Sequence, residues 1–190
     1  MVALDRRDVV AAFLKDRGDA AVVCGLGSPT WDVAAVDPSD RNFYSWGAMG
    51  GAVSMGLGLA LAQPDLRVIV VTGDGEAMMG VGSFATVATK QPKNLAILIL
   101  DNGHYGETGM QPAHTGMGAD LALMAQGAGL KNAATVRSDK EMAEALRTFH
   151  TTEGPLVVVA KIDPGAPPRV MPTRDAVENK ISFRKAVLGG

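Results

Sequence analysis

Apolar residues gather in short runs along the chain, separated by longer segments in which apolar and polar residues are mixed. The runs are rich in β-branched residues and apolar on both faces, which is typical of buried parallel strands. In the longer segments apolar residues recur three and four positions apart, which indicates helices. Strands are expected at 20–24, 42–46, 67–72, 95–100, 133–136 and 156–161, and helices at 5–17, 30–36, 50–63, 120–128, 138–150 and 173–188, with a further short helical segment after residue 73.

This alternation predicts an α/β fold, a doubly wound and mostly parallel sheet of about six strands with helices on both faces. The length of 190 residues favours a single domain that spans 1–190. Segment 163–172 holds four of the ten prolines, so it is expected to be extended. It leads into the C-terminal helix 173–188.

Composition and charge exclude several classes of protein. The net charge of -2, from 18 basic and 20 acidic residues, provides no basic field, so no nucleic acid and no membrane is expected as a partner. No apolar run approaches the roughly 20 residues that cross a bilayer, and the N-terminal segment lacks the apolar core of a signal peptide. Cys24 is the only cysteine, which favours a reduced, cytoplasmic setting.

The expected helix 50–63 is unusually rich in small residues. Glycine in a helix interior costs about 1 kcal/mol relative to alanine, so these positions need a reason in packing or in binding. Close approach to the sheet, to another chain or to a ligand would each supply one. The small residues are Gly50, Gly51, Ala52, Ser54, Gly56 and Gly58.

Two of the expected strands end abruptly in polar and glycine residues. Gly73-Asp74-Gly75-Glu76 follows the strand 67–72, and Asp101-Asn102-Gly103 follows the strand 95–100. Parallel strands end at one edge of the sheet, where open α/β sheets bind ligands, so Asp74 and Asn102 should lie side by side. Their oxygens, with the backbone carbonyl of His104, suit Mg2+ bound to a diphosphate. Backbone N–H groups of Gly75 and Glu76 would then face phosphate oxygens.

A nucleotide-binding or regulatory module is an alternative of a different class. Gly25-x-Gly27 follows an expected strand, but Thr30 stands where a dinucleotide fingerprint has its third glycine. The looser pattern at 80–85, Gly-Val-Gly-Ser-Phe-Ala, follows a helical segment and not a strand. Neither stretch supplies a phosphate loop.

The spacing of the two polar strand ends resembles the signature of thiamin diphosphate-dependent enzymes. Gly73-Asp74-Gly75 is followed by 25 residues and then by Asp101-Asn102, where the family has GDG and a terminal NN. Asp101 replaces the first Asn, which is not the metal ligand in the family. Upstream, Gly47-Ala48-Met49-Gly50 resembles the family's G-x-M-G turn, whose methionine supports the cofactor between its two rings. The resemblance implies the thiamin diphosphate-binding fold, a metal site at Asp74, Asn102 and His104, and cofactor contacts at Gly47, Ala48, Met49, Gly73, Asp74, Gly75, Glu76, Asn102, His104, Tyr105 and Gly106.

The stretch 101–112 narrows the resemblance to one group of this family. It reads DNGHYGETGMQP, similar to the NNGxYxSxGxQP stretch of phosphonopyruvate and sulfopyruvate decarboxylases. Gln63-Pro64-Asp65 and Glu178-Asn179-Lys180 resemble the same group. The implied activity is decarboxylation of a small anionic 2-oxo acid to an aldehyde and CO2. An acetolactate synthase-like carboligase is a close alternative. Candidate catalytic residues are His104, Glu107, Thr108 and Gln111.

The resemblance covers only the pyrophosphate-binding (PP) half of such enzymes. Their catalytic glutamate, which contacts N1' of the cofactor's aminopyrimidine, belongs to the pyrimidine-binding (PYR) half, for which this chain has no room. The resemblance therefore implies a β subunit that is inactive alone. A PYR-domain α subunit would complete the site at the interface of a hetero-oligomer, and the glycine-rich helix 50–63 is a candidate part of that contact.

Overall fold

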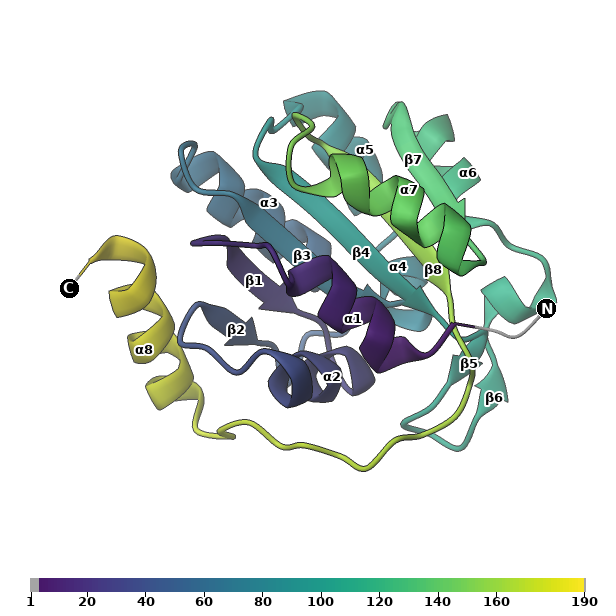
Figure 1. Ribbon diagram of the computed structural model, residues 1–190, viewed down its shortest axis with the longest axis horizontal. Helices are drawn as coiled ribbons and strands as arrows, with labels where there is room; N and C mark the ends of the chain where they lie inside the picture. The colour runs from purple at the N-terminus through teal and green to yellow at the C-terminus, as the bar shows by residue number, and fades with distance from the viewer. Residues whose placement is uncertain (1–3, 190) are drawn as a thin grey trace.

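The computed structural model describes residues 4–189, and its centre is a six-stranded sheet in the order β2-β1-β3-β4-β8-β7 (Figure 1). Every neighbouring pair in this sheet is parallel. This confirms the predicted α/β fold. The strands are β1 (Ala21–Cys24), β2 (Asn42–Tyr44), β3 (Val68–Gly73), β4 (Leu95–Asp101), β7 (Asn132–Val136) and β8 (Leu156–Lys161).

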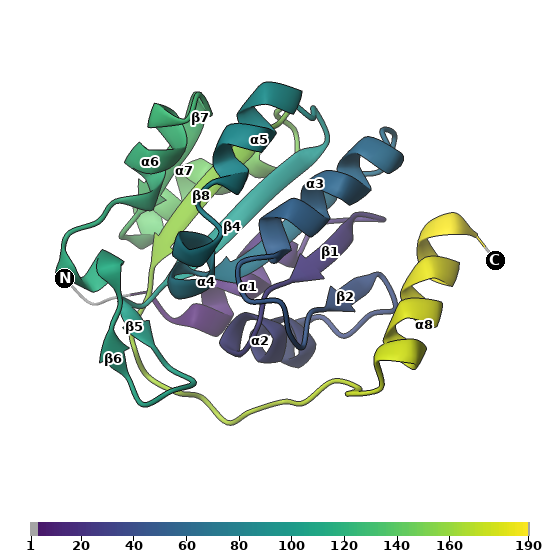
Figure 2. The same ribbon diagram turned by 180° about the vertical axis from the view of Figure 1, so that it is seen from behind.

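Helices cover both faces of the sheet. One layer is seen in front of the sheet in Figure 1, and the other faces the viewer in Figure 2. The first layer comprises α1 (Arg6–Leu14), α2 (Ser28–Val36) and α7 (Asp139–Phe149). The second comprises α3 (Ala52–Ala62), α4 (Asp74–Met79), α5 (Ser83–Lys90) and α6 (Leu121–Gly127).

Successive residues of the central strands enter two separate apolar cores. In β4, Ala96 and Leu98 pack under the first helix layer, whereas Ile97 and Ile99 pack under the second. Because side chains alternate between the faces of a strand, a strand that is apolar throughout can serve both layers. This is why the uninterrupted apolar run 95–100 indicates a strand with helices on both faces.

The chain reverses its direction of travel across the sheet between β1 and β3. From β1 it moves outward to β2, and it then returns to the other side of β1 as β3. In open α/β sheets the crevice at such a switch point, beyond the carboxyl ends of the strands, is where ligands bind. The turns after β1 and β3 therefore flank the expected binding crevice.

Four features differ from the expected elements. The helical segment after residue 73 is divided into α4 and α5, which are separated at Gly80–Gly82. A two-stranded antiparallel ribbon, β5 (His104–Tyr105) with β6 (Gln111–Pro112), was not expected. A short 3-10 helix, η1 (His114–Met117), follows the ribbon. Strand β2 ends at Tyr44, earlier than predicted, because the chain then turns, and the Ser45 hydroxyl donates to the carbonyl of Gly47 two residues further on.

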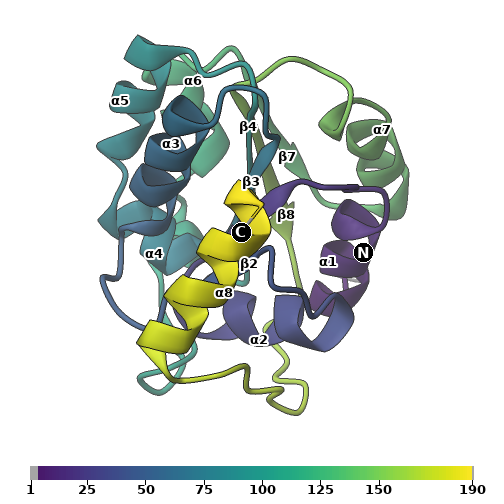
Figure 3. The same ribbon diagram turned by 90° about the vertical axis from the view of Figure 1, so that its left-hand side faces the viewer.

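The C-terminal part of the chain crosses the molecule from one side to the other. After β8, segment 163–175 has no helix or strand and runs past α2 to α8 (Ala176–Leu188), which lies beside β2 (Figures 1 and 3). The buried amide of Asn179 on α8 donates to the Tyr44 carbonyl at 2.9 Å. Its oxygen lies 3.5 Å from the Tyr44 N–H. None of the helices within residues 4–189 is both long and apolar enough to cross a membrane.

Candidate functional site

A cleft lies at the carboxyl edge of the sheet, beside the switch point. The turns after β1, β3 and β4 and the end of β8 contribute to its walls. The structure thus brings together segments that are far apart in the sequence, as expected for parallel strands that end at one edge. Nine of the predicted site residues line this cleft: Met49, Gly73, Asp74, Gly75, Glu76, Asn102, His104, Tyr105 and Gly106.

Asp74 is a buried carboxylate of the cleft, with 2% of its surface exposed. It is the first residue of α4, and its Oδ2 accepts a hydrogen bond from Thr115 Oγ1 at 2.5 Å. Burial raises the pKa of the Asp74 carboxyl and the charge of Asp101 raises it further, while the bond from Thr115 opposes the rise. A cation at this carboxylate would remove the cost of burying its charge.

Asn102 and His104 form a turn directly after β4. The side-chain oxygen of Asn102 accepts the His104 backbone N–H at 3.0 Å. The His104 ring folds back, with Nδ1 at 2.8 Å from the Asn102 carbonyl oxygen. A carbonyl can only accept, so we assign a ring proton to Nδ1.

The oxygens at this edge fit a hard divalent cation. Asp74 offers a carboxylate, Asn102 an amide oxygen with a second lone pair, and His104 a backbone carbonyl. Within residues 4–189 no three His, Cys, Asp or Glu side chains are grouped for metal binding. A zinc-type site is therefore not built here, whereas Mg2+ is commonly held by one or two carboxylates together with phosphate oxygens and water.

Glu76 has a role in the cleft that the sequence did not reveal. Only its backbone N–H was expected to take part, yet its buried side chain connects the turn after β1 with the end of β3. Oε2 accepts from the Leu26 N–H at 2.8 Å and from Thr72 Oγ1 at 2.9 Å. A Cβ on Gly25 would lie 2.0 Å from this oxygen, so a larger residue there would displace the Glu76 carboxylate. Glu76 thereby fixes the turn after β1 against the start of α4.

The turn that carries Met49 is held by close contact between backbones. Ala48 has a φ of 54°, in the left-handed region that non-glycine residues rarely adopt. Gly50 lies against the end of α4, where a Cβ on Gly80 would be 2.1 Å from the Gly50 carbonyl oxygen. Met49 reaches the cleft and remains 37% exposed. Gly47 and Ala48 are exposed and lie outside the lining.

The ribbon β5–β6 places the remaining candidates at different positions. The Tyr105 ring lies over Gly75, where a Cβ would be 2.5 Å from its Cε1. Glu107 lies against Gly27 and lines a second cavity next to the cleft. Thr108 and Gln111 are exposed and hydrogen-bonded to each other at 2.8 Å, so they belong to the ribbon and not to the cleft lining.

Asp101, which departs from the family pattern, is buried and paired. Its Oδ2 lies 2.5 Å from Lys161 Nζ, and its Oδ1 accepts the Gly103 N–H at 3.1 Å. The Lys161 cation at the end of β8 therefore compensates the charge that an asparagine would not carry. Asp101 supports the turn on which Asn102 stands.

Sequence reasoning also missed Arg6 and Thr115. Arg6 is the buried first residue of α1 and lines the cleft. Thr115 lies in η1 and contacts Asp74. Neither position has a local signal, because each reaches the cleft only through the tertiary fold.

Comparison with known proteins gives one family model and several relatives. Residues 26–160 match the model "Thiamine pyrophosphate enzyme, C-terminal TPP binding domain". The chain is 38% identical over 160 residues to sulfopyruvate decarboxylase subunit beta of Methanocaldococcus jannaschii, covering 84% of each protein. It is 40% identical over 148 residues to phosphonopyruvate decarboxylase of Streptomyces viridochromogenes, covering 78% of this chain but 37% of that one.

A solved structure agrees with these matches. The protein is from Mycobacterium smegmatis and is described as a candidate thiamin diphosphate-dependent enzyme. It superposes with a TM-score of 0.74 at 26% identity, over 85% of this chain and 32% of the other. The likeness thus extends over most of this chain.

Proposed function

Because the chain belongs to the thiamine pyrophosphate enzymes, through their C-terminal TPP-binding domain, we propose that it is the PP-domain (β) subunit of a heteromeric 2-oxo acid decarboxylase. The cofactors would be thiamin diphosphate and Mg2+. The substrate would be a small anionic 2-oxo acid of the sulfopyruvate or phosphonopyruvate type, which is converted to an aldehyde and CO2. A cytoplasmic location stays a prediction from the sequence.

The observation that carries this proposal is the meeting of Asp74, Asn102, His104 and Met49 on one cleft. We assign the Mg2+ to a carboxylate oxygen of Asp74, the side-chain oxygen of Asn102 and the carbonyl of His104. The backbone N–H groups of Gly75 and Glu76 would bind the diphosphate, as predicted. Met49, in its strained turn, would support the rings.

Thiamin diphosphate, when bound, supplies the electron sink for loss of CO2 from a 2-oxo acid. The residues of this chain would orient it and exchange protons near it. His104 has its Nδ1 engaged with Asn102, so Nε2 is the nitrogen available to accept a proton. Glu107, Thr108 and Gln111 lie outside the cleft lining, so a catalytic part for them requires that a partner close over the ribbon β5–β6.

A PYR-domain α subunit is the proposed partner. The relative from Methanocaldococcus jannaschii is called a beta subunit, and this chain covers 84% of it. The phosphonopyruvate decarboxylase relative is much longer, since the chain spans 37% of its length. These proportions support an arrangement in which the catalytic glutamate comes from another chain and the site lies at the interface.

Binding measurements on the complex with its co-purifying partner test the proposal. Calorimetry should detect thiamin diphosphate binding that requires Mg2+. Asp74→Asn should bind thiamin diphosphate much more weakly, and Mg2+ should no longer strengthen that binding. The control Asp65→Asn, at an exposed carboxylate, should bind the cofactor normally. Absence of binding to the wild-type complex would refute the cofactor assignment.

Activity measurements test the reaction and the split site. We expect CO2 release from sulfopyruvate or phosphonopyruvate by the complex and none from the isolated chain. Robust turnover by the isolated chain would contradict the need for a partner. Condensation of pyruvate without release of a free aldehyde would instead identify a carboligase.

A further inference from the structure

Arg6 is a buried cation at the boundary between two neighbouring cavities. Only 6% of its surface is exposed, and it lines both the cleft that contains Asp74 and the second cavity beyond it. Asn102 is shared between the two linings in the same way, whereas Met49 lines only the cleft. Arg6 therefore stands at the end of the cleft that holds Asn102.

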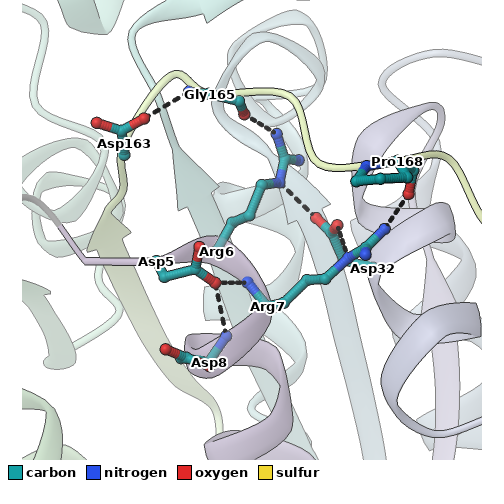
Figure 4. Close-up of polar contacts among 8 residues, drawn as sticks. All are labelled: Asp5, Arg6, Arg7, Asp8, Asp32, Asp163, Gly165 and Pro168. Atoms are coloured by element: carbon teal, nitrogen blue, oxygen red, sulfur yellow. Dashed lines mark hydrogen bonds and ion pairs between the residues drawn. The ribbon is translucent and has the colours of Figure 1, made fainter.

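One edge of the Arg6 guanidinium is fixed by a carboxylate. Its Nε donates to Asp32 Oδ2 at 2.7 Å, as Figure 4 shows. Asp32 is 1% exposed and comes from α2. On the other edge, Nη1 reaches only the carbonyl of Gly165, at 3.5 Å. A guanidinium has five N–H donors in a planar fork, so the edge away from Asp32 retains donors for a further acceptor.

Two further arginines line the second cavity together with Arg6. Asp32 is shared with Arg7, whose Nε lies 3.5 Å from Oδ1. A third guanidinium, that of Arg169, lies 4.2 Å from the centre of the Trp31 ring. The second cavity is thus lined by three arginines against the carboxylates of Asp32 and Glu107.

We propose that Arg6 binds the terminal phosphate of thiamin diphosphate and that Asp32 is the positioning residue that holds the guanidinium in place. This inference rests on the proposed function. If Asn102 is a metal ligand, the phosphate end of the cofactor lies at the end of the cleft where Asn102 and Arg6 are found. An arginine fork is suited to two oxygens of one phosphate, and its charge adds to that of the metal.

Arg7 provides a matched control. It follows Arg6 on the same helix, approaches the same carboxylate and hydrogen-bonds to the carbonyl of Pro168 in the same C-terminal segment (Figure 4). It lines the second cavity but not the cleft. Loss of Arg7 therefore disturbs the surroundings of Asp32 without removing the proposed phosphate contact.

The test compares two ligands that differ only in the terminal phosphate. Dissociation constants for thiamin diphosphate and thiamin monophosphate are measured by calorimetry with Mg2+, on the complex with the partner subunit. In Arg6→Met we expect thiamin diphosphate to bind roughly tenfold to a hundredfold more weakly, the range for a lost charged hydrogen bond. Binding of the monophosphate should change by less than about threefold, because it lacks the group that Arg6 contacts. The readout is the dissociation constant of thiamin monophosphate divided by that of thiamin diphosphate. Arg7→Met should leave this ratio unchanged, and Asp32→Asn should reduce it partly.

Equal weakening of both ligands in Arg6→Met, or no weakening, would overturn the inference and indicate a structural role. If Arg6→Met does not fold, Arg6→Lys decides, since it keeps the charge but loses the fork. In Arg6→Lys the ratio of the monophosphate to the diphosphate dissociation constant should fall, and an unchanged ratio would count against the inference. Failure of the wild-type complex to bind thiamin diphosphate would refute the proposed function itself.

Discussion

The glycine-rich helix α3 allows a sharp test of close packing, because two of its glycines have opposite surroundings. A Cβ on Gly56 would lie 2.2 Å from Val70 Cγ2 of β3 and 3.6 Å from Leu95 Cδ1 of β4. A Cβ on Gly58 would meet no atom within 4 Å, and this residue is exposed. Alanine at each position therefore separates helix propensity from packing against the sheet.

The expected magnitudes follow from two opposing effects. Alanine in place of an interior helical glycine stabilises a helix by about 1 kcal/mol, and this gain applies at both positions. Overpacking of a well-filled core costs about 1–3 kcal/mol, and this cost applies only at Gly56. We expect Gly58→Ala to be more stable than wild type. Gly56→Ala should be less stable than Gly58→Ala by about 1–3 kcal/mol, or roughly 2–12 °C in the unfolding midpoint for a chain of this length.

Urea unfolding followed by circular dichroism measures both variants. A third variant identifies the contact, since Val70→Ala removes the methyl group that the new Cβ would meet. In that background Gly56→Ala should lose most of its cost, which a double-mutant cycle would report as coupling between the two sites. Equal stability of Gly56→Ala and Gly58→Ala would refute the packing argument.

Three further predictions concern the cleft and the partner. Burial raises the pKa of Asp74, so the folded state holds its proton more tightly than the unfolded state, and stability falls as pH rises from the ordinary value of 3.8 through the raised one. Asp74→Asn should flatten this dependence in urea melts from pH 4 to 8, and an unchanged slope would contradict the assignment. Thr115→Val removes the bond that lowers this pKa, so Mg2+-dependent cofactor binding should shift to higher pH in calorimetric titrations, and an identical pH profile would argue against the contact. If α3 lies in the interface with the partner, Gly58→Ala should weaken their association several-fold in sedimentation experiments, although it stabilises the isolated chain. Unaltered association would show that Gly58 lies outside the interface.

Local patterns were sufficient to predict the strands and the pairing of their polar ends. The run 95–100 and its end at Asp101-Asn102 predict a strand because a buried parallel strand is apolar on both faces. Its carboxyl end lies at the edge of the sheet where ligands bind. The side chains of Asp74 and Asn102 could be placed together from the parallel order of the strands alone.

Other features depended on contacts that the sequence does not encode locally. The break between α4 and α5 lies where the backbone of Gly50 packs against Gly80. The sequence did not predict that the turn 47–50 contacts the end of α4. Strands of two residues, as in the ribbon β5–β6, are too short to show a period. Arg6 enters the cleft only because α1 begins beside the strand ends.

The amide of Asn179 has a consequence for how this protein can associate. It occupies the outward-facing N–H and C=O of Tyr44 on β2, the groups that a strand from another molecule would need in order to extend the sheet. Exposed strand edges are common starting points for aggregation and domain swapping. Helix α8 thus covers the edge of the sheet at β2. Growth by strand addition is blocked at β2, and association there must proceed through helices and loops.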